Sequence, residues 1–403
     1  MDNLIVNLVE KERKRQEETL SLIPSENYAS KAVRDAVGSV LANKYSEGYP
    51  GRRYYQGNSV MDEIENLAIE RGKKLFKLEH MNVQPYSGSP ANLAVLMALV
   101  EPGEKICGME LSSGGHLTHG HKVSVTGKWF KSVQYGVNKE GRIDCDEVLD
   151  LVKKESPKVI FAGTTAYPWA IDWKKFSKIA ESVDAFLVAD ISHISGLVAG
   201  GVVENPADYV HIVTSTTHKS LRGPRGAFIG VTNNGLEKDE SLAVKIDRAV
   251  FPGLQGGPHM NTISAMAICF EEAGSHEFAI YAKQILKNAK ALAEELRAGG
   301  LKVFGTDNHL LLLDVGLEKG RETALKLENV GIVVNANTIP GDAGSAMKPS
   351  GIRLGTPAVT TRGMKEAEMK KIGKLIVRVF AGDNLDKIKS EVLSICHTYP
   401  CPN

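Results

Sequence analysis

The 403-residue sequence predicts an α/β protein built on a mostly parallel sheet. Strand-like apolar runs alternate with helical patterns along much of the chain, and this alternation is typical of parallel strands connected by covering helices. Three polar residues, Thr165, Asp190 and Lys219, fall at the predicted carboxyl ends of such runs. Because ligands bind at the carboxyl ends of strands in sheets of this kind, we expect these side chains to converge on a site.

Helices are predicted where apolar residues recur at helical spacing, beginning with Leu4, Ile5 and Leu8 in a charged segment. The expected helices cover about residues 2–20, 30–42, 60–78, 173–182, 323–328, 365–380 and 385–397, with another ending near 100 and a long helical stretch from 258 to about 298. Short apolar runs predict strands at 81–84, 105–109, 158–163, 185–190, 211–217, 227–230 and 309–315. This order predicts an N-terminal arm (1–28), a large domain (29–272) and a smaller C-terminal α+β domain (273–403).

Composition argues against several classes of function. A formal net charge of +1 gives no global field for binding nucleic acid or a membrane surface. The five cysteines are scattered and odd in number, which favours reduced thiols over disulfides or a zinc site. No run has the roughly 18 apolar residues of a membrane span, and no signal-peptide pattern opens the sequence. We therefore expect a cytoplasmic protein.

The segment from Val213 to Gly226 places a single lysine after a predicted strand and before a Gly-Pro-Arg-Gly turn. This position would hold the amine of Lys219 rigidly at a pocket wall, where a desolvated amine can form a Schiff base. A surface lysine after a strand explains the local pattern equally well. The partners found elsewhere in the sequence favour a site.

A fixed lysine, a strand-end aspartate and a phosphate cup together suggest pyridoxal 5′-phosphate. That cofactor needs an amine, a carboxylate that keeps its pyridine nitrogen protonated, and donors for its phosphate. Ser87, Gly88 and Ser89 lie between a predicted strand and helix, where free backbone N–H groups can bind phosphate. Thr165 is a candidate for the ring hydroxyl and His116 for the ring face. Each of these patterns alone is also common in ordinary turns.

Histidines 116, 119 and 121 form a cluster that suggests a metal site as an alternative. Such a site needs a carboxylate or thiol nearby, and short motifs of this type often occur without a metal. We therefore expect no metal.

Two further segments contribute candidates. The loop Asn43–Gly57 contains three glycines, one proline, four tyrosines and a glutamate, so it is neither a regular helix nor a central strand. Ordered loops of this composition often carry functional residues. Arg353 follows a Ser-Gly-Ile run, and its guanidinium could bind a substrate carboxylate through two hydrogen bonds. A surface arginine in a strand is the simpler alternative.

Blocks along nearly the whole chain, from about residue 10 to 400, resemble serine hydroxymethyltransferase. These blocks are Ser21–Asn27, Asn43–Tyr55, Asn82–Asn92, Gly114–Gly120, Val213–Lys219, Phe251–Pro258, Gly305–His309 and Gly351–Gly363. The resemblance implies a fold type I pyridoxal-phosphate transferase that is active as a homodimer or a dimer of dimers with shared active sites. It implies the reversible conversion of L-serine and a tetrahydropterin to glycine and the 5,10-methylene carrier.

The resemblance also implies a role for individual residues toward the cofactor. Lys219 corresponds to the Schiff-base lysine, Asp190 to the partner of the pyridine nitrogen and His218 to a further cofactor contact. The other implied cofactor ligands come from several segments: His116 on the ring face, Thr165 and His193 near the ring hydroxyl, Ser87, Gly88 and Ser89 at the phosphate, and Tyr45, Gly256 and Gly257 from the partner subunit.

The substrate and pterin contacts are implied in the same way. Arg353 and Ser25 would hold the substrate carboxylate. Glu47, from the partner subunit, would handle the proton of the substrate hydroxyl, and Tyr55 would line the same pocket. The residues that match pterin contacts of the family are Leu111, Gly115, Leu117 and Asn337.

The sequence departs from the family pattern at three places. Ala336 stands where the family commonly has lysine, Ser345-Ala-Met347 replaces Ser-Pro-Phe, and Trp169 replaces an arginine. The family resemblance makes tetrahydrofolate the default one-carbon carrier. Because two of these changes lie in or beside the pterin-contacting loop, a modified archaeal-type pterin is the alternative. A pterin-independent aldolase of β-hydroxy amino acids such as threonine is the second enzymatic hypothesis, and a dimeric scaffold or RNA-binding protein is the non-enzymatic one.

Overall fold

The computed structural model describes residues 3–402. Its contacts divide the chain into two compact units. One unit is Ala29–Ala282, and the other joins the described parts of Met1–Tyr28 and Lys283–Asn403. The three-part domain division expected from the sequence stays a prediction.

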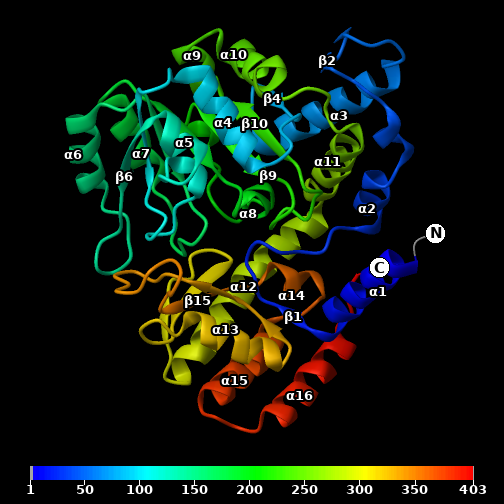
Figure 1. The fold of residues 1–403 in the computed structure, drawn as a ribbon, viewed down its shortest axis with the longest axis vertical. Helices are drawn as coiled ribbons and strands as arrows, with labels where there is room; N and C mark the ends of the chain where they lie inside the picture. The colour runs from blue at the N-terminus through cyan, green and yellow to red at the C-terminus, as the bar shows by residue number, and fades with distance from the viewer. Residues whose placement is uncertain (1–2, 403) are drawn as a thin grey trace. The chain divides into compact units, whose positions relative to one another are not determined.

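The first unit is organised around a seven-stranded sheet (Figure 1). In spatial order the strands are β4 (His80–Asn82), β10 (Ala227–Val231), β9 (Ile212–Thr216), β8 (Phe186–Asp190), β7 (Val159–Gly163), β5 (Lys105–Met109) and β6 (Lys131–Tyr135). β10 runs antiparallel to both β4 and β9, and all other neighbouring pairs in this sheet are parallel. The expectation of a mostly parallel α/β sheet is therefore confirmed.

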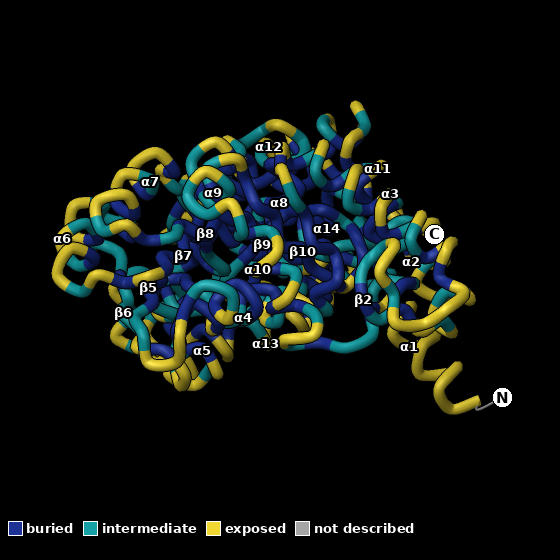
Figure 2. The backbone as a smooth tube through the Cα atoms, turned by 90° about the horizontal axis from the view of Figure 1, so that it is seen from above, coloured by how far each residue is buried: buried dark blue, intermediate teal, exposed yellow. Residues whose placement is uncertain are grey.

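The strands β7, β9 and β10 are buried at every position, because helices cover both faces of the sheet. Figure 2 shows α7 and α8 on one side of the strands and α4 and α5 on the other. The helices of this unit are α2 (Lys31–Val37), α3 (Ser59–Phe76), α4 (Gly88–Leu99), α5 (Val125–Trp129), α6 (Cys145–Glu155), α7 (Trp173–Glu181), α8 (Ser195–Ala199), α9 (Asn233–Lys238), α10 (Leu242–Arg248) and α11 (Met260–Ala273).

Short elements connect these helices and strands. They are the 3₁₀ turns η1 (Val40–Asn43), η2 (Leu117–His119) and η3 (Pro206–Asp208), the π-turn η4 (Ala249–Leu254), and a small hairpin of β2 (Gly48–Tyr49) and β3 (Arg52–Arg53). The apolar core includes Leu96, Phe161, Val188 and Ile229, which are fully buried. Burial of these side chains supplies the main driving force for folding of the unit.

The second unit contains an antiparallel sheet of four strands. In order these are β11 (Lys302–Phe304), β12 (Leu310–Asp314), β15 (Gly351–Gly355) and β14 (Asn335–Asn337). Two short strands, β1 (Leu20–Ser21) and β13 (Ile332–Val333), pair in parallel. The helices are α1 (Asn3–Glu18), α13 (Gly320–Asn329), α14 (Pro357–Thr361), α15 (Glu366–Phe380) and α16 (Leu385–Thr398), and α12 (His276–Ala298) contains the boundary between the units.

Arg362 joins distant segments of the second unit. Its buried guanidinium donates hydrogen bonds to the carbonyl oxygens of Thr19, Cys396 and Tyr399, at 2.7, 3.0 and 2.6 Å. These carbonyls lie at the carboxyl-terminal ends of α1 and α16, where backbone acceptors lack helical partners. One side chain thus fixes the segment around residue 19 to the end of α16.

The expected elements match with some differences. The helix expected over 30–42 ends at Gly38, and η1 follows. The long helical stretch is two helices, because Gly274 caps α11 and the Ser275 hydroxyl accepts from the Phe278 N–H at the start of α12. Several elements were not expected, among them the strands β6, β11 and β14 and the helices α5, α6, α9 and α10. None of the helices within residues 3–402 combines the length and hydropathy of a membrane span.

Candidate active site

Three neighbouring parallel strands bring the expected strand-end residues to one edge of the sheet. Asp190 is the last residue of β8, Thr165 follows β7 and Lys219 follows β9. Since β7, β8 and β9 are adjacent and parallel, their carboxyl ends lie together. This edge is where ligands bind in open α/β sheets.

Asp190 lies at the centre of a buried hydrogen-bond network. Its Oδ2 accepts from Asn92 Nδ2 at 2.9 Å and lies 3.1 Å from His119 Nε2, while its Oδ1 accepts from the Ser192 N–H at 3.0 Å. Burial alone would raise the pKa of Asp190, but His119, His116 and Ser192 outweigh it and hold the pKa well below its usual range. The carboxylate is therefore ionised at neutral pH.

Asn92 and His119 are held in place by further contacts. Thr214 donates to Asn92 Oδ1 at 2.7 Å, and Asn92 Nδ2 also donates to Thr118 Oγ1 at 2.9 Å. The His119 ring is fully buried and stacks on Phe161 with ring centroids 4.7 Å apart. Neither residue was expected from the sequence as a partner of Asp190. Asn92 stood out only by its place in the Asn82–Asn92 block, and His119 only by its places in the Gly114–Gly120 block and in the histidine cluster.

His116 lies beside this network as a neutral ring. Its Nδ1 is 2.7 Å from Thr118 Oγ1. Burial is the main reason that the pKa of His116 falls to about 4, and the nearby charges of His119 and Lys219 add to the effect. A neutral, partly buried imidazole suits stacking against a flat aromatic ligand.

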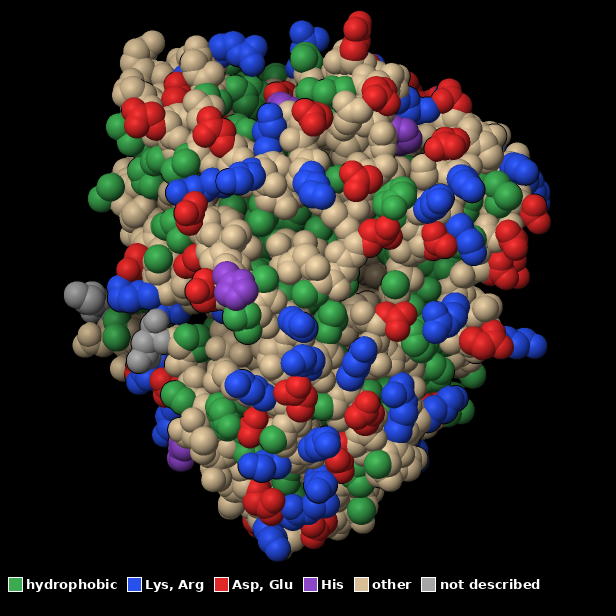
Figure 3. Space-filling model, turned by 180° about the vertical axis from the view of Figure 1, so that it is seen from behind, with side chains coloured by type: hydrophobic (Ala, Val, Ile, Leu, Met, Phe, Trp, Pro, Cys, Tyr) green, Lys and Arg blue, Asp and Glu red, His purple; other side chains and the backbone are tan. Residues whose placement is uncertain are grey.

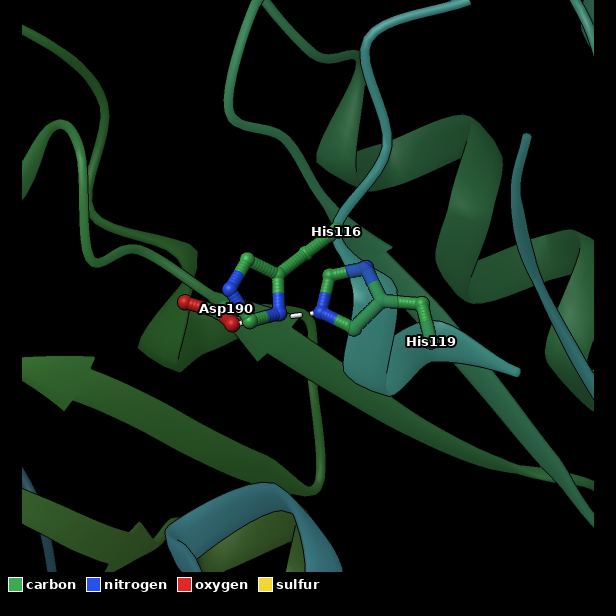
Figure 4. A group of neighbouring side chains, drawn as sticks. All are labelled: His116, His119 and Asp190. Atoms are coloured by element: carbon green, nitrogen blue, oxygen red, sulfur yellow. Dashed lines mark hydrogen bonds and ion pairs between the residues drawn. The ribbon is translucent and has the colours of Figure 1, made fainter. Parts of the chain in front are cut away.

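His116, His119 and Asp190 also form the one set of potential metal ligands within the described chain (Figure 4). Their ligand atoms lie within 4.8 Å of one another. The cluster expected from the sequence as an alternative metal site therefore includes an aspartate but not His121. The hydrogen bond between His119 and Asp190 accounts for this arrangement without an ion.

The lysine and the expected phosphate cup lie next to each other. Lys219 Nζ donates to Thr216 Oγ1 at 2.7 Å. A Cβ atom on Gly88 would lie 2.9 Å from Thr216 Cγ2, so the close approach requires glycine at this position. Ser87 precedes α4 without capping it through its side chain, and Gly88 and Ser89 open the helix. Backbone N–H groups at this helix start therefore lie close to the lysine.

Thr165, His193 and His218 complete the strand-end group. Thr165 Oγ1 donates to the carbonyl of Gly115 at 2.7 Å and so fixes the segment Gly114–Gly120, which carries His116. The His193 side chain is buried, and its carbonyl accepts from Ser220 Oγ at 2.9 Å. Burial, with the charges of Lys219 and Arg225, lowers the pKa of His218 to about 3. The His218 Nδ1 is buried and has no hydrogen-bond partner within residues 3–402.

A second cluster brings together residues from the 43–57 loop and the glycine pair. A Cβ on Gly257 would lie 3.0 Å from the Tyr45 ring, and one on Gly256 would lie 3.1 Å from Glu47 Oε1. The rings of Tyr45 and Tyr55 meet edge to face at 5.1 Å. Tyr45, with 54% of its surface exposed, lines a cavity of about 640 Å³ together with both glycines.

Arg53 anchors the loop that carries this cluster. Its Nη1 donates to the carbonyls of Ser46 and Gly48 at 2.9 and 2.8 Å, on either side of Glu47. Asn58 Nδ2 donates to the Tyr55 carbonyl at 2.9 Å. The loop is therefore ordered by buried polar contacts although three of its tyrosines, Tyr45, Tyr54 and Tyr55, are exposed. Sequence reasoning did not identify Arg53 as an anchor.

Arg353 and Ser25 belong to the second unit. Arg353 lies in β15, and burial lowers its pKa to about 10. The segment before Ser25 packs on the end of the same strand: Gly355 N–H donates to the Leu22 carbonyl at 2.7 Å, and a Cβ on Gly355 would lie 2.6 Å from Pro24. Both expected carboxylate-binding residues therefore lie in one unit, on segments that contact each other.

The expected pterin contacts are divided between the units. Leu111 and Gly115 lie between β5 and η2 in the first unit, the exposed Leu117 begins η2, and Asn337 ends β14 of the second unit. Ala336 pairs with Ile352, so it lies on the opposite face of the sheet from Asn337. The Met347 side chain is exposed, and the Trp169 ring lies 4.1 Å from the guanidinium carbon of Arg142.

Charged side chains do not segregate on the surface. On the face shown in Figure 3, lysines and arginines alternate with aspartates and glutamates. This mixture fits the net charge of +1 and gives no extended basic surface on that face.

Comparison with known proteins identifies the family. The model of the serine hydroxymethyltransferase family matches residues 1–376. A serine hydroxymethyltransferase of Acidothermus cellulolyticus is 52% identical over 416 residues, covering 100% of this chain and 96% of the relative. A serine hydroxymethyltransferase of Phenylobacterium zucineum and serine hydroxymethyltransferase 2 of Cupriavidus pinatubonensis are each 49% identical over 99% of this chain, with 95% and 96% of the relatives covered. The chain therefore belongs to the serine hydroxymethyltransferase family.

Proposed function

We propose that Lys219 holds pyridoxal 5′-phosphate at the strand-end site and that the surrounding residues carry the interconversion of serine and glycine. The family consists of fold type I, pyridoxal-phosphate-dependent hydroxymethyltransferases, so the reaction itself follows from membership. The assignment of roles to individual residues is our proposal. The observation that carries it is the ionised, buried Asp190 at the same sheet edge as the Lys219 amine.

The groups at this edge fit the cofactor chemically. The site offers an amine, a carboxylate of low pKa, a helix start with N–H donors, and the buried, unpartnered Nδ1 of His218. Lys219 would hold the aldehyde carbon, Ser87, Gly88 and Ser89 the phosphate, and Thr165 and His193 the ring hydroxyl. When bound, the cofactor supplies an electron sink for the carbanion formed at the amino acid.

Asp190 would keep the pyridine nitrogen of the cofactor protonated, because its own carboxyl group stays ionised. Asn92, His119 and Ser192 bind both carboxylate oxygens and fix their direction. Such fixed charges stabilise developing charge without reorganisation during the reaction. His116, neutral near pH 7, covers the ring face without competing for the proton.

Arg353, assisted by Ser25, binds the carboxylate of the amino acid. A guanidinium matches a carboxylate with two parallel hydrogen bonds, which orients the substrate as well as holding it. Glu47 accepts or donates the proton of the serine hydroxyl, and Tyr55 lines the same pocket. Leu111, Gly115, Leu117 and Asn337 contact the pterin, which we take to be tetrahydrofolate.

Two copies of the chain form the working unit in this proposal. Tyr45, Glu47, Gly256 and Gly257 form one cluster, and the exposed tyrosines beside a 640 Å³ cavity support a role toward a neighbouring subunit. Most closed oligomers of one chain are twofold dimers, in which each subunit presents the same surface to the other. Each site would then combine the strand-end group of one subunit with the tyrosine cluster of its partner.

The test has two parts. Borohydride reduction of the loaded protein followed by peptide mapping should place the cofactor on Lys219 and leave Lys219→Arg unlabelled. Cleavage of serine should depend strongly on tetrahydrofolate. A label on another lysine, such as Lys245, contradicts the assignment of Lys219 as the cofactor lysine. A rate of serine cleavage that does not depend on tetrahydrofolate favours the aldolase hypothesis.

A further inference from the structure

Asn335 lies directly opposite Arg353 in the second unit. The register of β14 and β15 pairs these two residues, while Leu312 of β12 pairs with Arg353 on the other side. Residues directly opposite in an antiparallel pair share one face of the sheet. Ile352 and Leu354, the neighbours of Arg353 in sequence, belong to the apolar core on the other face.

Both ends of the Asn335 amide are engaged. Arg353 Nε donates to Asn335 Oδ1 at 3.1 Å, and Asn335 Nδ2 donates to the carbonyl of Ala336 at 3.0 Å. The backbone contact turns the amide oxygen toward the guanidinium. Because a guanidinium is planar and rigid, a hydrogen bond at Nε restricts the orientation of the whole group.

We propose that Asn335 is a positioning residue that orients the Arg353 guanidinium for a carboxylate through a neutral acceptor, which adds no negative charge at this position. This inference rests on the proposed role of Arg353 in binding the carboxylate of the amino-acid substrate. A neutral acceptor can fix the plane of a guanidinium, whereas an aspartate at the same position would form an ion pair with it. In a partly buried setting such a pair is strong and would compete with the substrate.

Burial of Arg353 supports the argument for a neutral partner. Burial lowers the pKa of this arginine, so its charge is poorly hydrated. A poorly hydrated cation gains more from an incoming anion than an exposed one does. A negative charge at position 335 would therefore reduce this attraction for the substrate.

The experiment measures binding of glycine and glycinamide to the full-length, cofactor-loaded protein by calorimetry. Glycinamide keeps the amine but lacks the carboxylate, so it reports on everything except the Arg353 contact. We expect Asn335→Ala to weaken glycine binding about 3–10-fold and Asn335→Asp by about tenfold or more, with glycinamide binding unchanged in both. Asn329→Asp, which makes the same change at an exposed position of α13, should leave both ligands unaffected.

The outcomes separate this inference from the proposed function. Arg353→Ala is measured alongside: if it binds glycine like the parent, the role of Arg353 itself is wrong. If Arg353→Ala loses glycine binding but Asn335→Asp keeps it, the positioning role of Asn335 is overturned. Equal losses for glycine and glycinamide in the Asn335 variants also overturn it, because they indicate a general structural defect. Circular dichroism of each variant checks that the fold is retained.

Discussion

Arg53 and Glu65 form a buried ion pair next to the loop Asn43–Gly57. Arg53 Nη2 lies 2.7 Å from Glu65 Oε2, and the two side chains are only 3% and 1% exposed. Gln84 Nε2 donates to Glu65 Oε1 at 2.7 Å and to the carbonyl of Gly48 at 2.9 Å. The same carbonyl also accepts from Arg53. The pair therefore connects Gly48 in the loop to Glu65 in α3 and, through the same network, to Gln84 just after β4.

Arg53→Ala should lower the free energy of unfolding by about 3–5 kcal/mol, because it leaves the buried Glu65 carboxylate without its partner. Urea denaturation followed by fluorescence and circular dichroism measures the loss. Arg52→Ala is the matched control, since the Arg52 side chain is exposed, and its effect should stay within about 0.5 kcal/mol. Equal stabilities of the two variants would show that the buried pair is energetically unimportant.

Asp190→Asn should lower turnover more than cofactor content. An amide cannot keep the pyridine nitrogen protonated, so we expect a loss of roughly 100-fold or more in rate. Turnover and bound cofactor, measured by absorbance, are compared in the same preparation. Asp184→Asn, an exposed aspartate paired with Lys238, serves as control because surface pairs contribute little. A variant that turns over like the parent rules out the role of Asp190.

Mixing two inactive variants tests whether sites are shared between subunits. Glu47→Gln subunits keep Lys219, and Lys219→Arg subunits keep Glu47. If each site uses residues of both chains, a mixed dimer regains one intact site. Random pairing of equal amounts should then restore about a quarter of the parent activity, since half of the dimers are mixed. Confirmed mixed dimers without pterin-dependent activity would show that each subunit is self-contained.

The stability of the fold should depend on pH through His211. Its Nδ1 accepts the Leu187 N–H at 2.8 Å, and burial is the main cause that lowers its pKa to about 4. The unfolded chain, with a histidine pKa near 6.5, binds the proton first, so stability contributed by the neutral ring is present above about pH 6.5 and is lost as pH falls toward 4.

His211→Asn should flatten this pH dependence, because the amide oxygen can accept the same N–H without titrating. Unfolding free energies measured at several values between pH 7 and 4.5 give the slope. His397→Asn replaces an exposed histidine and should keep the slope of the parent. If His211→Asn and His397→Asn follow the same curve, the titration of His211 does not contribute.

The fold class and the family could be predicted because their signals are local. Alternating apolar runs gave the parallel sheet, and long motif blocks such as Val213–Lys219 gave the family, and both are confirmed. The roles of the site residues stay predictions. Asn92, His119 and Asn335 were missed because their partners are distant in sequence: Asn92 meets Asp190 across 98 residues, and only the strand register brings Asn335 to Arg353.

Arg53 was missed for a related reason. It stands next to Arg52 in the same motif, and nothing in the pattern separates the buried arginine from the exposed one. The two differ in environment because the short hairpin of β2 and β3 turns one side chain inward. Alternation over two residues is too short a signal to assign a face without the neighbouring helix.

Arg362 donates to the carbonyls of both Thr19 and Tyr399, and these contacts set an order of events during synthesis on the ribosome. Residues 3–28 emerge before the whole of Ala29–Ala282, yet the partners of β1 and of the Thr19 carbonyl are translated only at Ile332 and beyond. Domains generally fold as units as they emerge. The early segment therefore remains without these partners until the rest of the second unit has been translated.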